Sequence, residues 1–118
     1  MASTFFQKAG QNKHVFYNVN DRMPPLELQL IQSSDGAYYD ISAGKGHIEI
    51  QAADGTYLVS GQSLNVASGA TGTAHYYPAA GELSAAGTYN VAWKIDPQNI
   101  SAYLTVPEYP YEYVLRID

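Results

Sequence analysis

Carboxylates are the side chains with which this chain could most readily do chemistry, and Glu49, Glu108 and Glu112 are candidate members of a hydrolytic pair. Such a pair needs two carboxyl groups roughly 5–10 Å apart, one on either side of the bond that breaks. The sequence places no two of them together. A chain of 118 residues also has little room for the long loops that build a cleft. We therefore expect no catalytic residues, with a small hydrolase assembled from distant carboxylates as the alternative.

Histidine is the other acid–base group of the chain and a common metal ligand. His14, His47 and His75 lie far apart in the sequence and show none of the paired spacings typical of zinc sites. Each falls in a segment of strand character, opposite its apolar neighbours, so we expect the imidazoles to face solvent. Only a convergence of three strands would bring them together. The sequence contains no Cys, which removes thiolate ligands and disulfides.

Two further patterns could indicate ion binding. Asp35, Asp40 and Asp54 offer oxygen ligands for Ca²⁺, which takes about six to eight of them. Asp35 and Asp54 each precede a Gly, however, and turn geometry accounts for that pairing without a metal. The Gly-Lys-Gly around Lys45 lacks the spacing of a phosphate-binding loop and is followed by a predicted strand. We expect neither a metal nor a cofactor.

The elements that must position these residues are almost all strands. Apolar and polar residues alternate in the segments 26–31 and 47–53, and turn residues separate such segments along the chain. This pattern predicts an all-β fold, an immunoglobulin-like antiparallel β-sandwich of about seven strands. The segment 79–86 carries helix-forming residues without a strand pattern, so we expect one short helical turn there. Residues 1–12 are predicted to form an N-terminal arm, and residues 13–118 the single domain.

The stretch SAAGTYNVAWKID, residues 84–96, carries the clearest structural signal. Tyr89, Val91, Trp93 and Ile95 occupy every second position after Gly87, so they share one face of a strand. In immunoglobulin-type sandwiches, a Tyr near the start of a late strand sends its hydroxyl back to upstream backbone. We predict that Tyr89 is this corner residue and that all four alternating side chains form the structural core.

Composition disfavours some classes of partner. Charged residues make up 14% of the chain, against about 25% in typical domains, and the net charge is −5. Six Lys and Arg, none clustered, disfavour nucleic acid. No apolar run approaches the roughly 20 residues that span a bilayer, so we expect no membrane partner. The opening MASTFFQKAGQNKH lacks the features of a secretory signal peptide.

Tyr and Phe are the candidate contact residues. The chain has eleven Tyr, whose rings combine apolar area with a polar tip. Tyr111 and Tyr113 share the face of a predicted strand with apolar residues and are assigned to the core. Tyr109, between two Pro, cannot join a regular ladder, and Phe5 and Phe6 have no place in the sandwich pattern. We predict that Tyr109, Phe5 and Phe6 contact a partner.

The order of motifs also resembles a known family. After L-x-L-x-L at 26–30 come DISAG, IEI, ADGT, GTAHYYP, ELSAAGTYNVAW and YLTVP. This order, over roughly residues 26–117, resembles bacteriophage virion modules such as the N-terminal domain of phage baseplate upper proteins and related small immunoglobulin-like domains. No catalytic residue is carried over from that family.

The resemblance implies a non-enzymatic structural protein of the virion, made in the host cytoplasm. It would be an accessory module of the tail, baseplate or capsid surface, present in many copies and bound to other virion proteins. The sequence leaves two alternatives open. One is a capsid decoration protein specifically, and the other is a β-sandwich module that binds a glycan on the host surface.

Overall fold

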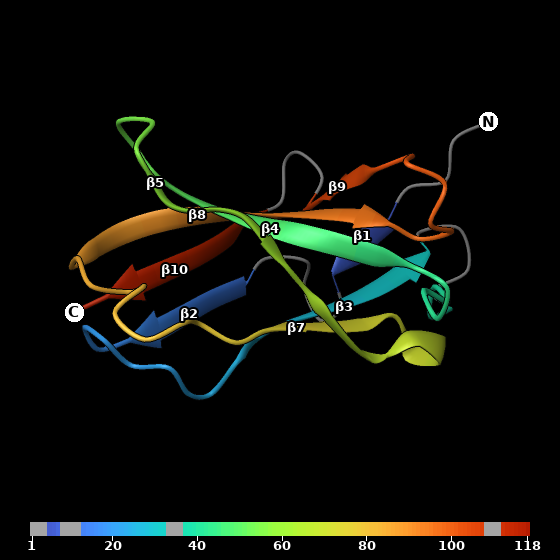
Figure 1. The fold of residues 1–118 in the computed structure, drawn as a ribbon, viewed down its shortest axis with the longest axis horizontal. Helices are drawn as coiled ribbons and strands as arrows, with labels where there is room; N and C mark the ends of the chain where they lie inside the picture. The colour runs from blue at the N-terminus through green and yellow to red at the C-terminus, as the bar shows by residue number, and fades with distance from the viewer. Residues whose placement is uncertain (1–4, 8–12, 33–36, 108–111) are drawn as a thin grey trace.

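Two facing β-sheets form the protein, as Figure 1 shows. The computed structural model describes residues 5–7, 13–32, 37–107 and 112–118. The strands are β1 (Phe5–Gln7), β2 (Lys13–Tyr17), β3 (Leu26–Gln32), β4 (Lys45–Ala52), β5 (Tyr57–Ser63), β6 (Asn65–Ser68), β7 (Thr73–Tyr76), β8 (Gly87–Asp96), β9 (Leu104–Val106) and β10 (Tyr113–Ile117). One 3₁₀ turn, η1 (Gly69–Thr71), lies between β6 and β7.

The strand order confirms the predicted all-β sandwich. One sheet has the order β1-β3-β7-β6, and the other has the order β2-β10-β8-β4-β5, with β9 also paired to β8. These orders correspond to the two sheets of variable-type immunoglobulin domains, in which an added strand extends the second sheet. The chain passes from the second sheet to the first at Leu64, between β5 and β6.

The sandwich differs from the predicted one in its first and last strands. β1 pairs antiparallel with β3, whereas β2 lies in the other sheet and pairs parallel with β10, so the fold is not wholly antiparallel. β9 and β10 pair with opposite ends of β8 and together form a divided last strand. Because both terminal strands are divided and β5 extends the second sheet, the described residues contain ten strands rather than about seven.

The predicted helical turn is misplaced. Helical geometry occurs at η1, while residues 79–86 form a non-helical turn in which the Glu82 N–H donates to the Ala79 carbonyl at 3.0 Å. Gly81 has a φ of 73°, which a right-handed helix does not use. The Glu82 carboxylate instead accepts from the Ala79 N–H and from the Tyr76 hydroxyl. Side-chain bonds, rather than helical ones, therefore hold this crossing.

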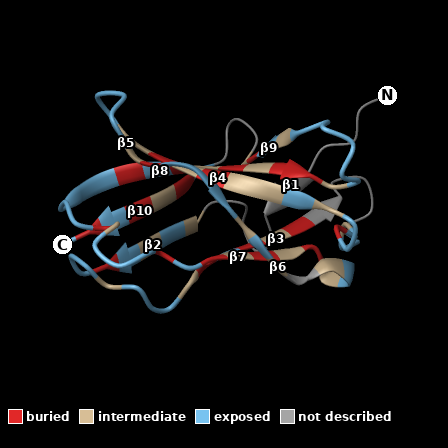
Figure 2. Cartoon of the chain, viewed as in Figure 1, coloured by how far each residue is buried: buried red, intermediate tan, exposed pale blue. Residues whose placement is uncertain are grey.

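The inner faces of both sheets form one apolar core, shown in red in Figure 2. Tyr89, Val91, Trp93 and Ile95 all lie in it, on the face that their alternation assigns to them, and the exposed fraction of Trp93 is 0%. Tyr113 packs against the indole with ring centroids 5.4 Å apart. Antibody domains carry their buried Trp on the third strand, whereas the buried Trp of this chain is on β8.

A hydroxyl bond fixes the start of β8. The Tyr89 hydroxyl donates to the Ala85 carbonyl at 2.8 Å, four residues upstream, which is the geometry of a tyrosine corner. Gly87 has a φ of 151°, and a Cβ atom there would lie 3.4 Å from the Tyr89 hydroxyl oxygen. A glycine is favoured because side chains rarely adopt this φ, while the Tyr89 ring lies over the position at an ordinary contact distance.

Removing the corner bond or the indole should destabilise the fold by different amounts. Tyr89→Phe should cost about 1–2 kcal/mol, because the Ala85 carbonyl loses its donor. Trp93→Ala should cost about 3–5 kcal/mol through loss of packing in the core. Urea denaturation of both variants measures these differences, and curves that match the unmodified protein would show that the wrong face had been placed inside.

Candidate functional site

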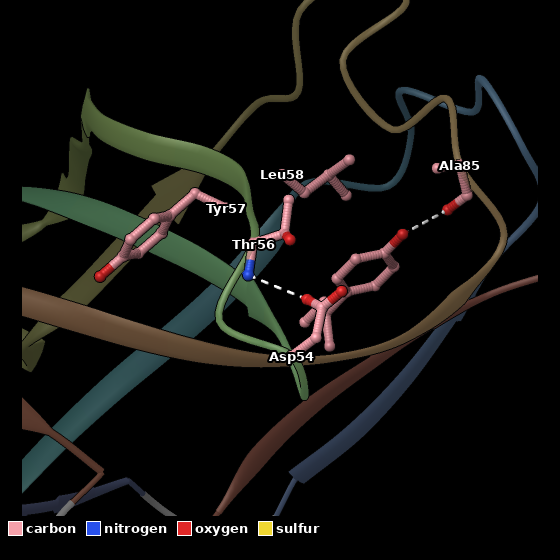
Figure 3. A pocket seen from close by; sticks show the side chains of 7 residues that line it. Asp54, Thr56, Tyr57, Leu58 and Ala85 are labelled. Atoms are coloured by element: carbon pink, nitrogen blue, oxygen red, sulfur yellow. Dashed lines mark hydrogen bonds between the residues drawn. The ribbon is translucent and has the colours of Figure 1, made fainter.

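A shallow recess lies beside the β4–β5 hairpin, with a volume of about 240 Å³. Figure 3 shows the residues that line it, which are Ala52, Asp54, Thr56, Tyr57, Leu58, Ala85 and Tyr89. The recess is smaller than the roughly 300–1,000 Å³ of typical ligand pockets.

The Asp54 and Tyr89 side chains of this recess are already bonded to the chain. The Asp54 carboxylate accepts the Thr56 N–H at 2.9 Å, and the Tyr89 hydroxyl is bonded to Ala85. The N–H and hydroxyl of Thr56 lower the pKa of Asp54. These contacts form the turn of the hairpin, in which Gly55 has a φ of 91°. The recess is thus a by-product of the hairpin and the tyrosine corner.

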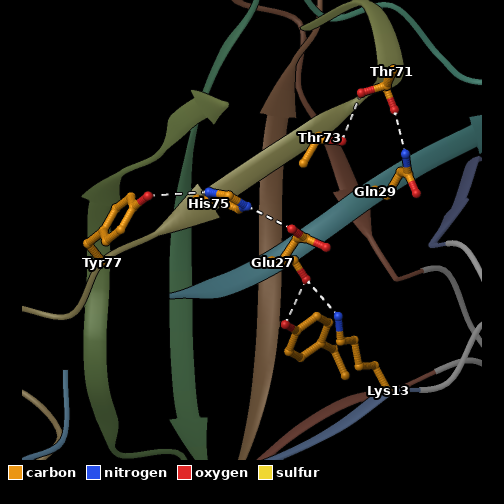
Figure 4. Close-up of polar contacts among 8 residues, drawn as sticks. Lys13, Glu27, Gln29, Thr71, Thr73, His75 and Tyr77 are labelled. Carbon is orange, nitrogen blue, oxygen red and sulfur yellow. Dashed lines mark hydrogen bonds and ion pairs between the residues drawn. The ribbon is translucent and has the colours of Figure 1, made fainter. Parts of the chain in front are cut away.

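A second polar cluster lies on the outer face of the four-stranded sheet (Figure 4). Glu27 on β3 is directly opposite His75 on β7, and their side chains meet at 2.8 Å. The Tyr77 hydroxyl lies 3.5 Å from the other imidazole nitrogen. A hydroxyl, an imidazole and a carboxylate in this order can activate a nucleophile. However, the cluster is exposed, and 3.5 Å is at the limit of a hydrogen bond, so it acts as a cross-strand pair.

The carbonyl of Glu27 marks the place where the first strand changes sheets. β1 covers β3 only at Leu30–Gln32, so the described residues place no strand beside Glu27 on that edge. Its carbonyl accepts from the Tyr113 hydroxyl at 2.8 Å and from Lys13 Nζ at 3.4 Å, as Figure 4 shows. Burial raises the pKa of Tyr113, which keeps the hydroxyl protonated as a donor. Tyr113 therefore ties β10 in one sheet to β3 in the other.

Removing this tie should weaken the sandwich. Tyr113→Phe is expected to cost about 1 kcal/mol, because Lys13 still donates weakly to the Glu27 carbonyl. Tyr103→Phe is the matched control, because its ring is half exposed, and it should change stability by less than about 0.5 kcal/mol. Equal unfolding midpoints for Tyr113→Phe and Tyr103→Phe would contradict a role for the hydroxyl bond.

A buried carboxylate organises the loop after β8. Asp96 is fully buried, and its two oxygens accept the N–H groups of Ile100 at 3.0 Å and Ser101 at 2.8 Å. Burial by itself raises the pKa of this carboxyl. The backbone N–H groups of residues 100–102 and the Lys45 ammonium outweigh burial and lower the pKa below its ordinary value. The charged form of Asp96 is therefore the one that holds the loop.

This loop displays an aliphatic side chain to solvent. Asn99 and Ser101 have φ values of 55° and 60°, a conformation that residues other than glycine adopt uncommonly. Ile100 lies between them with an exposed fraction of 65%. Tyr103 follows, half exposed, with its ring centroid 5.5 Å from that of His47 on β4.

Neighbouring loops lie at the same end of the sandwich (Figure 1). Asp40 accepts the N–H and the hydroxyl of Ser42, at 2.8 and 2.6 Å, and these bonds lower its pKa. Ile41 is buried and donates its N–H to the Gly69 carbonyl at 2.8 Å. Gly44 packs against the backbone of Pro97. We call the three ranges 37–44, 69–72 and 97–103 the loop end.

The stabilising effect of Asp96 should depend on pH in a defined direction. Its folded-state pKa lies below the unfolded value of about 4. The carboxylate therefore stabilises the fold above that value, and the contribution is lost as pH falls through the folded pKa. Asp96→Asn should lower the denaturation midpoint near neutral pH, and its difference from the unmodified protein should shrink below about pH 4.

Asp118→Asn is the control for this experiment, because it removes an exposed carboxylate from the last residue. It should lower the midpoint less than Asp96→Asn does. A difference between Asp96→Asn and the unmodified protein that grows on acidification would have the wrong sign for the assigned pKa.

The structure places the three histidines on different strands. His14 is on β2, His47 on β4 and His75 on β7, while Glu49 is on β4 and Glu112 directly precedes β10. Across the described ranges, no three His, Asp or Glu side chains gather as metal ligands would. In the same part of the chain, no helix has the length and hydropathy to cross a membrane.

The predicted partner contacts are only partly described. The backbone of Phe5 and Phe6 belongs to β1, so this part of the predicted arm is a strand of the sandwich. Contact of either residue with a partner stays a prediction. Several further residues of the sequence analysis lie outside the described residues, namely Tyr109, Tyr111, Asp35 and Glu108.

Comparison with known proteins adds no relative to this picture. No family model matches the chain, and no significant match is found among curated proteins.

Sequence reasoning missed Ile100 and the buried Asp96. The available signal was the order Asp96-Pro97, since Asp followed by Pro is typical of the first two positions of a tight turn. That signal predicts a turn, but it does not show which side chain of the turn is exposed to solvent.

Proposed function

We propose that this chain is a non-enzymatic structural protein of a bacteriophage virion. It would be an accessory module on the tail, baseplate or capsid surface that binds neighbouring virion proteins in many copies. The motif order that resembles phage virion modules supports the virion setting, and the immunoglobulin-like strand order agrees with that resemblance.

One observation supports a structural role over a catalytic one. Several acidic and Tyr side chains of the described residues are bonded to the chain's own backbone. Asp54 and Asp96 hold loops, Tyr89 fixes a corner, and Tyr113 joins the two sheets. Tyr17 is a further example, since its hydroxyl donates to the carbonyl of Pro24. These side chains therefore stabilise the fold.

Apolar side chains are meanwhile exposed on a surface that carries little charge. Phe16 and Ile100 each expose about two thirds of their area, and Tyr57 and Tyr103 about half. Large apolar and Tyr side chains in solvent favour lasting contact with another protein, because contact removes their area from water. A module with a fixed position on a particle would use these exposed side chains for such contacts.

The test is to locate the chain in purified particles. We expect it to copurify with virions through a density gradient, in a fixed ratio to the major capsid protein measured by mass spectrometry. Disruption of the particles into heads and tails should leave it in one fraction only, which separates the tail or baseplate location from the capsid location. Recovery only from the soluble host fraction would contradict the proposal.

A further inference from the structure

The backbone conformation of the loop after β8 keeps the Ile100 side chain exposed to solvent. Asn99 and Ser101, on either side of it, adopt left-handed backbone conformations. The buried Asp96 carboxylate fixes the turn by accepting the N–H groups of Ile100 and Ser101. Strained backbone positions persist where the surrounding structure enforces them, and they are common at binding sites. A loop without a partner would gain stability by turning an aliphatic side chain inward, as Ile41 does in the adjacent loop.

The loop end is also almost without charge. Asp40 is the one charged residue in the sequence ranges 37–44, 69–72 and 97–103, and its carboxylate is bonded to Ser42. Lys45 and the buried Asp96 border these ranges, and their opposite charges attract each other. Tyr, Ser, Gly and Asn make up much of these ranges, as they do in the binding loops of antibodies. The opposite end of the sandwich carries Asp21, Arg22 and the ion pair of Arg116 with Asp118.

We infer that the loop end is the surface through which this protein binds a neutral, partly apolar patch on another virion protein. The inference rests on the proposed function and names the surface that performs it. Ile100 is the apolar anchor, and Tyr103 extends the surface beside it. A protein fits this surface better than a saccharide does, since an aliphatic anchor neither stacks on a sugar ring nor donates a hydrogen bond to its hydroxyls.

Particles grown from a genome that lacks this gene are the probe. Purified chain is added to them, and the bound amount is measured against free concentration. Ile100→Ser should weaken binding about tenfold or more, as expected for a buried anchor. Met23→Ser is the matched control, since Met23 has the same exposed fraction of 65% but lies in the segment between β2 and β3, outside the loop end, and should bind like the unmodified chain.

Two conditions test the chemistry of the partner. Because the loop end presents almost no charge, raising NaCl from about 0.1 to 1 M should change the affinity by less than about threefold. Periodate oxidation of the particles, which destroys sugar diols, should leave binding intact. Binding that is lost with periodate would identify a glycan and overturn the protein partner, and binding lost in salt would overturn the neutral interface.

The outcomes separate this inference from the proposed function. If the unmodified chain does not bind the deletion particles, the virion role fails and the inference fails with it. If Ile100→Ser binds as well as the unmodified chain, the loop end is the wrong surface while the virion role stands. The unfolding midpoints of Ile100→Ser and Met23→Ser must match that of the unmodified protein. Ile100→Leu should restore the affinity to within about threefold of the unmodified chain.

Discussion

The burial of one face of β8 is the constraint on which the rest of the structure depends. β8 pairs with β4, β9 and β10, and its inner face carries Tyr89, Val91, Trp93 and Ile95. Without disulfides, the two sheets are held by this packing and by single side-chain bonds. Both ends of β8 are fixed in the same way, by the Tyr89 hydroxyl at the start and the Asp96 carboxylate at the end.

The second feature of the molecule is that several of its polar side chains bond to its own backbone. Carboxylates and Tyr hydroxyls bond to backbone groups that the strands leave unpaired, as at the Glu27 carbonyl, where the first strand has changed sheets. The energetic reason is that an unpaired buried carbonyl costs more than a typical hydrogen bond gains. Side chains such as Ile100 and Tyr103 are instead exposed to solvent, and the proposed partner contact falls on them.

Local patterns in the sequence were enough to predict the fold class and the inner face of β8. A period of two assigns alternating residues to one side of a strand, and the tyrosine corner spans only four residues. Pairing of the terminal strands could not be predicted, because it depends on contacts far apart in the sequence, such as β2 beside β10. The segment 79–86 misled because its composition favours a helix, while Gly81 and the bonds of Glu82 set a different turn.

The candidate surface was less predictable than the core. Ile100 is an apolar residue in the sequence, and only the backbone of its loop turns it toward solvent. The central claim is that this end of a packed, non-catalytic sandwich faces its neighbour. A near-atomic cryo-electron microscopy map of the native virion tests it most directly. Density for the sandwich with residues 97–103 against another protein is the predicted result, whereas a sandwich bound through its opposite end, with Ile100 open to solvent, would contradict it.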